Sequence, residues 1–330
     1  MALRSGQAGN RRAGISAAAL LVGTWLAPPP VPAEPFAYVT NQRANNVSVI
    51  DTATHAVVKT IAVGKNPAGV AVSRDGSKVL VTNPDSSEVA LIDGREQKLL
   101  VLLRVGDGPL GVAVDPAGTR AYVADFYGHF VSVIDLADRS ILKRVPVGHY
   151  PAGIAVSPDG SKIYVAERED NTLSIINALT LTVDRTGRVG QHPFGLALDE
   201  NRGRVYVANV ESNDVSVLDA HTLAPIKTIK VGERPYAVAV TRDGEQVFVT
   251  NQYDSSVSVI DARKLEASAT IKVGEYPEGI ARHPDGRHVY VANWFDNSVS
   301  VVDVSGLKVV KTIPTDNGSR AFGNFIPSLN

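Results

Sequence analysis

Apolar residues along this chain come in short runs rich in Val, Ile, Ala and Tyr, separated by polar residues and by Gly or Pro. One run is a tetrapeptide made of an aromatic or aliphatic residue, an invariant Val, a small residue and a polar residue. It begins at positions 38, 80, 122, 164, 206, 248 and 290, so each step is 42 residues. Short runs with many β-branched and aromatic residues, bounded by turn residues, are typical of β-strands.

Two further elements keep the same spacing. A second apolar run ends in a polar residue at positions 51, 93, 135, 177, 219, 261 and 303, and a V-G-x-x-P turn places glycine at 64, 106, 148, 190, 232 and 274. Each repeat therefore predicts four strands, here called a to d. In the fourth copy they run from Gly153 to Ser157, Lys162 to Ala166, Thr172 to Ile176 and Leu181 to Val189.

Stacked four-stranded units of about 40 residues are the blades of a β-propeller. The repeat predicts an all-β fold, a seven-bladed β-propeller that occupies residues 34–330 as one domain. The chain enters at a b strand and ends in a segment that resembles an a strand, Arg320 to Ile326. We expect this last strand to pair with the N-terminal strands of Phe36 to Val63 and to close the ring.

The tetrapeptide Tyr38-Val39-Thr40-Asn41 with its copies, the V-G-x-x-P turns and the terminal Ala321 to Ile326 resemble the YVTN-family β-propeller repeat proteins, which are exported and YncE-like. The resemblance covers about residues 36–326. It implies a propeller outside the cytoplasm, in a family whose members mostly have an unassigned or a binding role. Related propellers include lactonases, lyases and haem-binding subunits, so the fold alone does not select a function.

Residues 1–33 are typical of a secretory signal peptide, with Arg4, Arg11 and Arg12 before an apolar run from Ala17 to Leu26. The small residues around Ala33 predict cleavage before Glu34, and an uncleaved anchor is the alternative. The mature protein is then expected to be periplasmic or secreted, without a membrane span. Removing three arginines and no acid shifts the formal charge from −1 to −4.

Composition excludes several chemistries. The chain has no Cys, which rules out disulfides, thiolate metal sites, a catalytic cysteine and covalent c-type haem. A mildly acidic chain without a Lys/Arg cluster makes nucleic acid an unfavourable partner. No nucleophile elbow, zinc-protease motif or phosphate-binding loop occurs. We assign no cofactor and no metal, and an enzyme is the less favoured interpretation.

Variation among repeats indicates where a ligand binds, because positions that are alike in every blade serve the blade. The b–c and d–a loops emerge on one face, here called the loop face, while the a–b and c–d turns form the opposite turn face. Large side chains gather on the loop face, and packing between blades is the alternative explanation for them. The predicted ligand-binding residues are Phe126, Tyr127, His129, His149, Tyr150, His192, Phe194, Tyr236, Tyr276 and Trp294.

Two further features of the sequence, a group of histidines and an unusual arginine, have both a functional and a structural interpretation. His129, His149 and His192 fall near Asp125 and Glu167, a combination suited to a divalent ion, but no metal-binding spacing supports a site. Arg282 occupies a strand position that is apolar in five other repeats. A buried charge needs a partner, so we expect a structural ion pair rather than a catalytic arginine, with Glu278 or an acid of a neighbouring blade as the partner.

These observations favour a non-catalytic extracytoplasmic propeller that binds a protein, a glycan or a small ligand on its loop face. The alternative is a propeller lyase or lactonase with a site in the central funnel, with or without a divalent metal.

Overall fold

The computed structural model describes residues 1–3, 6 and 35–328. The chain divides between Ala33 and Glu34. The predicted signal segment lies almost entirely outside the described residues and remains a prediction. The strands all belong to the second unit, and among the described residues no helix combines the length and apolarity needed to cross a bilayer.

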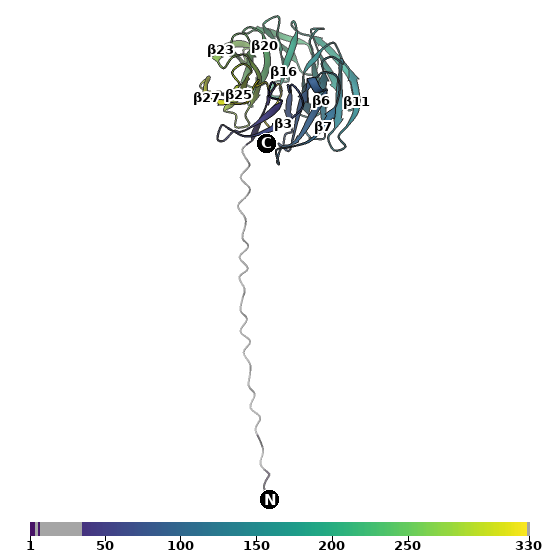
Figure 1. The fold of residues 1–330 in the computed structure, drawn as a ribbon, viewed down its shortest axis with the longest axis vertical. Coiled ribbons are helices and arrows are strands. Elements are labelled where there is room, and N and C mark those ends of the chain that lie inside the picture. The colour runs from purple at the N-terminus through teal and green to yellow at the C-terminus, as the bar shows by residue number, and fades with distance from the viewer. Residues whose placement is uncertain (4–5, 7–34, 329–330) are drawn as a thin grey trace. The chain divides into compact units, whose positions relative to one another are not determined.

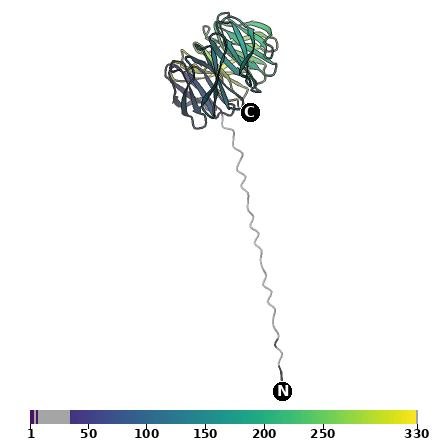
Figure 2. The same cartoon turned by 90° about the vertical axis from the view of Figure 1, so that its right-hand side faces the viewer.

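The second unit is a seven-bladed β-propeller (Figures 1 and 2), as predicted. Blade 1 contains β1 to β3, and each later blade adds four antiparallel strands, ending with β24 to β27 in blade 7. The a strands are β4 (Val70–Val72), β8 (Pro109–Val114), β12 (Pro151–Val156), β16 (Pro193–Asp199), β20 (Pro235–Val240) and β24 (Pro277–Arg282). The b strands are β1 (Phe36–Asn41), β5 (Lys78–Asn83), β9 (Arg120–Asp125), β13 (Lys162–Glu167), β17 (Arg204–Asn209), β21 (Gln246–Asn251) and β25 (His288–Asn293).

The c strands are β2 (Asn46–Asp51), β6 (Glu88–Asp93), β10 (Phe130–Asp135), β14 (Thr172–Asn177), β18 (Asp214–Asp219), β22 (Ser256–Asp261) and β26 (Ser298–Asp303). The d strands are β3 (Ala56–Ala62), β7 (Lys98–Arg104), β11 (Ser140–Pro146), β15 (Thr182–Arg188), β19 (Pro225–Lys230), β23 (Glu266–Lys272) and β27 (Lys308–Pro314). A single 3-10 turn, η1 (Pro84–Ser86), is the one helical element among the described residues.

Burial follows the position of a strand in its blade. The a strands of successive blades contact one another around the centre of the ring, and the b and c strands are buried almost throughout. The d strands form the outer wall and alternate between exposed and half-buried positions. Apolar residues on both faces of the b and c strands therefore pack against the neighbouring blades.

Tyrosines of the repeated tetrapeptide join neighbouring blades. The hydroxyl of Tyr38 donates to the carbonyl of Gly94 at 2.9 Å, and that of Tyr164 donates to the carbonyl of Ala220 at 2.7 Å. Each bond links a b strand to the c–d turn of the next blade. Because the rings are fully buried, the hydroxyl needs such a partner.

The C-terminal segment closes the ring as predicted. The amide of Tyr38 donates to the carbonyl of Phe325 at 2.9 Å, and the amide of Val70 donates to the carbonyl of Phe322 at 2.8 Å. The segment thus lies between β1 and β4, although it forms only isolated bridges rather than a regular strand. Gly323 explains the interruption, because its φ of 118° departs from the extended conformation. In Figure 1, β27 and β3 lie at neighbouring places in the ring.

Repeated aspartates brace the turn face. Oδ1 of Asp51 accepts the amides of Ala53 and Thr54 at 2.8 and 3.2 Å, and Asp93, Asp135, Asp219 and Asp261 make the same pair of bonds. The recurrent acids therefore stabilise these turns, and Asn177 accepts the equivalent amides in blade 4. They are therefore not candidates for a catalytic role.

Candidate functional site

A funnel opens on the loop face at the centre of the ring. Its volume is about 610 Å³, which lies in the range of small-molecule sites. All seven blades contribute to its wall, from Gln42 in blade 1 to Tyr276 and Glu278 in blade 7. The site is therefore assembled by the ring as a whole rather than by one blade.

The predicted residues divide into two groups. Those that line the funnel are Phe126, Tyr127, Phe194, Tyr236 and Tyr276, and those outside its lining are His129, His149, Tyr150, His192 and Trp294. Tyr127 is 64% exposed, whereas Phe194 and Tyr236 are each only 6% exposed. Both explanations for the aromatic residues thus apply, to different members: Tyr127 is free to contact a ligand, while Phe194 and Tyr236 pack between blades.

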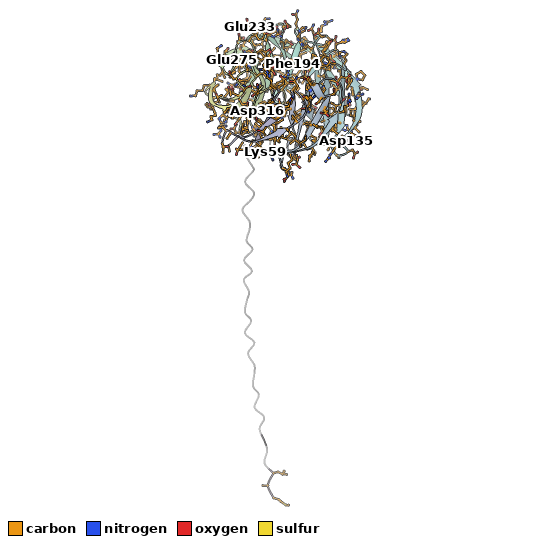
Figure 3. All side chains as sticks on the ribbon, in the orientation of Figure 1. Lys59, Asp135, Phe194, Glu233, Glu275 and Asp316 are labelled. Carbon is orange, nitrogen blue, oxygen red and sulfur yellow. The ribbon has the colours of Figure 1, made fainter. Side chains whose placement is uncertain are left out.

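The floor of the funnel is an aromatic stack. The rings of Phe194 and Tyr236 are stacked with centroids 4.1 Å apart, and Phe322 of the closing segment packs on Phe194 at 4.9 Å. Figure 3 labels Phe194 well inside the ring, on β16, and Glu233 near its edge. This packing connects the base of the funnel to the closure of the propeller.

A buried ion pair lies beside that stack. Nε of Arg320 is 2.7 Å from Oε2 of Glu278, and Nη2 of Arg320 donates to the hydroxyl of Tyr236 at 2.6 Å. Nε2 of Gln252 donates to the other carboxylate oxygen of Glu278 at 3.1 Å. Because the Tyr236 oxygen accepts from Arg320, its own proton is available to a molecule in the funnel.

Burial sets the protonation of this group. Desolvation acts to lower the pKa of Arg320, but the charge of Glu278 and the interactions with Tyr236 and Tyr276 together outweigh it, so the pKa of the guanidinium is raised and the cation persists. Burial also raises the pKa of Tyr236, which keeps the phenol neutral. Burial also raises the pKa of Glu278, against the opposing effect of Arg320, so the floor offers a neutral hydroxyl beside a guanidinium and its partner carboxyl group.

Two further arginines line the wall with unused donors. Nε of Arg168 and Nε of Arg234 are both buried without a hydrogen-bond partner among the described residues. Arg234 pairs with Glu211 at 2.9 Å through Nη1. Within the described part of the chain the guanidinium of Arg168 has no carboxylate within 4.0 Å, and its Nη2 lies 3.3 Å from Nδ1 of His192. A buried donor left without a partner costs free energy unless a ligand or water accepts from it.

The d–a loops share one left-handed backbone position. Asn66, Tyr150, His192, Arg234 and Tyr276 occupy equivalent places in the d–a loops, each with φ between 53 and 58°, and Gly108 and Gly318 take that place in the other two copies. This left-handed region favours Gly and Asn and is costly for bulky residues. The c–d turns of the turn face hold large residues such as Arg139, Leu181 and Leu223 in the same conformation, so the positive φ belongs to the repeat and only the identity of the side chains sets the loop face apart.

The three predicted histidines mainly brace loops. Nδ1 of His129 accepts the amide of Tyr150 at 3.1 Å, at the position where Asn171 and Asn213 accept equivalent amides in other blades. Nδ1 of His149 contacts Asp170 at 2.9 Å, and His192 lies 3.6 Å or more from acidic oxygens. His129 and His149 are neighbours with ring centroids 5.0 Å apart, but His192 belongs to a separate ion cluster.

Tyr150 and Trp294 contact residues of the funnel lining without belonging to it. Tyr150 packs on Phe126 at 4.9 Å between centroids, and the indole of Trp294 donates to Oε1 of Gln42 at 3.0 Å. Arg43 stacks over the Trp294 ring at 4.3 Å. These residues hold lining residues in position.

The expected pair between Arg282 and Glu278 does not form. Glu278 faces the loop-face funnel and pairs with Arg320, whereas Arg282 lines the part of the central channel that opens on the turn face. Among the described residues Arg282 has no ion pair within 4.0 Å. The prediction was wrong because residues four apart on a strand lie on the same side but about 13 Å apart along it, so the two side chains reach opposite ends of the central channel.

Sequence reasoning did not assign the polar part of the funnel. Arg168, Arg234, Glu278 and Arg320 were recognisable only as loop positions that vary between repeats. Gln42, Asp85 and Gln252 gave no signal beyond their place in b–c loops. Their convergence depends on the curvature of the ring, which a linear repeat does not reveal.

Comparisons with known proteins agree with this architecture. A family model described as lactonase, 7-bladed β-propeller, matches residues 103–230. No curated protein matches the chain.

Solved structures show the same fold at low identity. A hydrazine synthase chain from Kuenenia stuttgartiensis aligns with a TM-score of 0.75 and 18% identity over 86% of this chain and 99% of that chain. A functionally unknown protein from Desulfotomaculum acetoxidans aligns with a TM-score of 0.78 and 18% identity over 89% of this chain and 99% of that chain. The dihydro-heme d1 dehydrogenase NirN aligns with a TM-score of 0.68 and 17% identity over 90% of this chain and 77% of that chain.

The model of the YncE-like β-propeller family matches residues 34–120 and 190–284, more than half of the chain. The protein therefore belongs to the YncE-like β-propeller family.

Proposed function

We propose that this protein is a non-catalytic binding propeller whose loop-face funnel holds a small molecule with an acidic group on an apolar body. The observation that carries the proposal is the unpartnered Nε of Arg168, buried in a funnel wall that also presents aromatic rings. Guanidinium groups bind carboxylate or phosphate oxygens through charge-assisted hydrogen bonds.

The funnel offers complementary surfaces for such a molecule. Phe126, Tyr127 and Tyr276 provide apolar contact on the wall, while Arg168 and Arg234 provide donors. Tyr236 adds a neutral hydroxyl at the floor. A concave site of this volume fits a small ligand better than a protein surface or an extended glycan.

Export follows from the predicted signal segment and extends the proposal. We infer that the protein works in the periplasm or outside the cell after cleavage before Glu34. Mass spectrometry of protein from the cell envelope or medium should find a chain that starts at or near Glu34. Retention of Met1 on a membrane-bound product would overturn this inference.

A lactonase is the second candidate, because a lactonase family model matches residues 103–230. Hydrolysis of a cyclic ester needs a base to activate water, and Glu278 is the most deeply buried acid of the funnel lining. However, both its carboxylate oxygens face Arg320 and Gln252. A carboxylate engaged in this way is poorly placed to accept a proton, so binding without catalysis is favoured.

Calorimetric titration tests the proposal with matched acids and amides. We expect phenylacetate and hexanoate to bind about 10- to 100-fold more tightly than phenylacetamide and hexanamide, because a hydrogen bond to a charged group contributes about 1.5–3 kcal/mol. Arg168→Gln should remove most of that preference and leave the unfolding temperature unchanged.

Lys162→Ala, on the turn face, is the matched control and should leave binding intact. Equal binding of acids and amides, or no loss with Arg168→Gln, would overturn the acidic-ligand assignment. Turnover of γ-butyrolactone or N-acyl homoserine lactone that disappears in Glu278→Gln would replace it with the lactonase.

A further inference from the structure

The turn face departs from its repeat at one a–b turn. In three blades a hydroxyl residue precedes the turn and donates to the turn aspartate: Ser73 to Asp75 at 2.7 Å, Ser157 to Asp159 at 2.6 Å and Thr241 to Asp243 at 2.6 Å. In blade 7 the equivalent residues are His283 and Asp285, and β25 begins with a second imidazole, His288, where β5 and β13 begin with lysine.

Both imidazoles face the carboxylate of Asp285. Nδ1 of His283 lies 3.0 Å from Oδ1, and Nδ1 of His288 lies 2.7 Å from Oδ2. The three candidate ligand atoms all lie within 4.8 Å of one another. His283 is only 5% exposed, and the side chains of Asp285 and His288 are 20% and 23% exposed. The cluster is thus sheltered but reachable from solvent.

Hydrogen bonds determine the tautomer of His283. The carbonyl of Pro35 can only accept, so the hydroxyl of Thr52 donates to it at 2.5 Å. The same hydroxyl oxygen lies 3.0 Å from Nε2 of His283 and must accept from that nitrogen. Nε2 therefore carries the proton of the neutral ring, and Nδ1 presents a lone pair to Asp285.

This arrangement is unfavourable without a cation. The amide of Asp285 donates to Nδ1 of His283 at 3.3 Å, which again identifies that nitrogen as an acceptor. Its lone pair then faces a carboxylate oxygen at 3.0 Å with no hydrogen bond aligned between them.

We propose that His283, Asp285 and His288 bind a divalent transition-metal ion such as zinc, and that Thr52 positions His283 for this role. Two imidazole nitrogens and one carboxylate oxygen are a ligand set that zinc accepts, with water in the fourth position. Metal-binding imidazoles usually donate their second N–H to a fixed acceptor, as Nε2 of His283 does to Thr52.

The proposed site stabilises the closure of the ring. Its three ligands belong to blade 7, whereas Thr52 lies in the c–d turn of blade 1. The hydroxyl of Tyr290, on β25, also lies 3.0 Å from Nδ1 of His55 in that turn. Metal binding would hold the His283 ring against Thr52 and so reinforce the contact between the first and last blades. Arg287, whose Nε is 3.9 Å from Asp285 and whose side chain is 78% exposed, can turn away.

Zinc titration of the full chain, purified without a histidine tag and dialysed against EDTA, tests the proposal. We expect one equivalent to bind and to raise the unfolding temperature by several degrees, because a ligand that binds only the folded state stabilises it. Cobalt(II) should give the visible absorption of a four-coordinate nitrogen and oxygen site.

The repeat itself supplies variants that preserve the turn. His283→Ser recreates the residue at position 157, and His288→Lys recreates the residue at position 162. Each should weaken zinc binding by about tenfold or more, as expected for loss of a ligand, and should leave the unfolding temperature in EDTA within a few degrees of wild type. His149→Ser, which alters the other neighbouring histidine pair, should leave binding unchanged.

Three outcomes would overturn the site. The first is the absence of zinc binding at millimolar zinc, which would mean that the imidazoles share only protons with Asp285. The second is undiminished binding in both His283→Ser and His288→Lys. The third is loss of binding in His149→Ser. If His283→Ser were to unfold, the cobalt spectrum of His288→Lys would still decide the assignment.

Discussion

The two faces of this propeller use the same repeat differently. On the turn face, blade after blade keeps one solution, an aspartate that accepts two backbone amides, as Asp51 and Asp261 do. On the loop face, one left-handed backbone position holds Asn66 and Gly318 in two copies and Tyr, His or Arg in four. Regularity thus marks residues that serve the blade, and departures in side-chain identity mark candidates for another role.

The closing segment should produce the largest effect, because both faces depend on it. A chain that ends at Ser319 loses the hydrogen bonds of Phe322 and Phe325 to β4 and β1, and it leaves Glu278 without Arg320. The edges of two blades are then exposed, which favours aggregation. We expect an insoluble protein or a much lower unfolding temperature in a thermal melt. A soluble truncated protein that melts like the full chain would show that closure does not depend on this segment.

A pair of aromatic substitutions tests the division within the loop face. Phe194→Ala removes a buried ring from the stack with Tyr236 and should cost about 3–5 kcal/mol in the free energy of unfolding. Tyr127→Ala removes an exposed ring, so unfolding should be unchanged while affinity for phenylacetate falls by about tenfold. Chemical denaturation and calorimetry provide both measurements.

The reverse result, a destabilised Tyr127→Ala and a stable Phe194→Ala, would mean that the exposed ring packs and the buried ring binds. Loss of affinity in Phe194→Ala alone would also contradict this assignment.

Most of the architecture could be predicted because the repeat is visible without any knowledge of the fold. The b strand expected from Lys162 to Ala166 extends one residue further, to Glu167, and the a strand begins at Pro151 rather than Gly153. The closure from Arg320 to Ile326 followed from counting strands. These features depend on local pattern and periodicity, which the sequence contains directly.

The site was only partly predictable because it depends on how far each side chain reaches into the ring. Phe194 and Tyr127 both stood out as large loop residues, yet one is buried and the other exposed. His129 also stood out, but its nitrogen replaces an asparagine oxygen that braces the same loop. His283 and His288 lie around a turn with an ordinary Pro-Asp-Gly sequence, and the sequence does not show that both face Asp285 or that Thr52, 231 positions away, contacts His283.

Acid should destabilise the turn face through its aspartates. Hydrogen bonds from Ser157 and from the backbone and side chain of Ser161 lower the pKa of Asp159 to about 2. A carboxyl group whose folded pKa is depressed stabilises the fold above its unfolded pKa of about 3.9, and this contribution disappears as the pH falls through the folded value.

The unfolding temperature should therefore decrease between about pH 4 and pH 2. Because Asp159 is exposed, solvent screening limits the loss to below about 1 kcal/mol for this turn. Asp159→Asn should reduce the slope over that interval and lower the stability at pH 7 by no more than this small amount. An identical slope in the variant would show that other acids control the transition.

The smallest expected effect tests whether the loop face accepts a cost in stability. His192 has a φ of 53°, and the equivalent residue of another d–a loop is Asn66, with a φ of 58°. Asparagine tolerates this conformation better than histidine, so His192→Asn should stabilise the protein by a few tenths of a kcal/mol, while Asn66→His should destabilise it by a similar amount. The gain is small because His192→Asn also removes the contact with Nη2 of Arg168 at 3.3 Å. That same loss should free Arg168 to move and weaken phenylacetate binding.

Stability that rises while affinity for phenylacetate falls would match the contrast between the two faces. A destabilised His192→Asn beside a neutral Asn66→His would instead mean that His192 is held for packing alone.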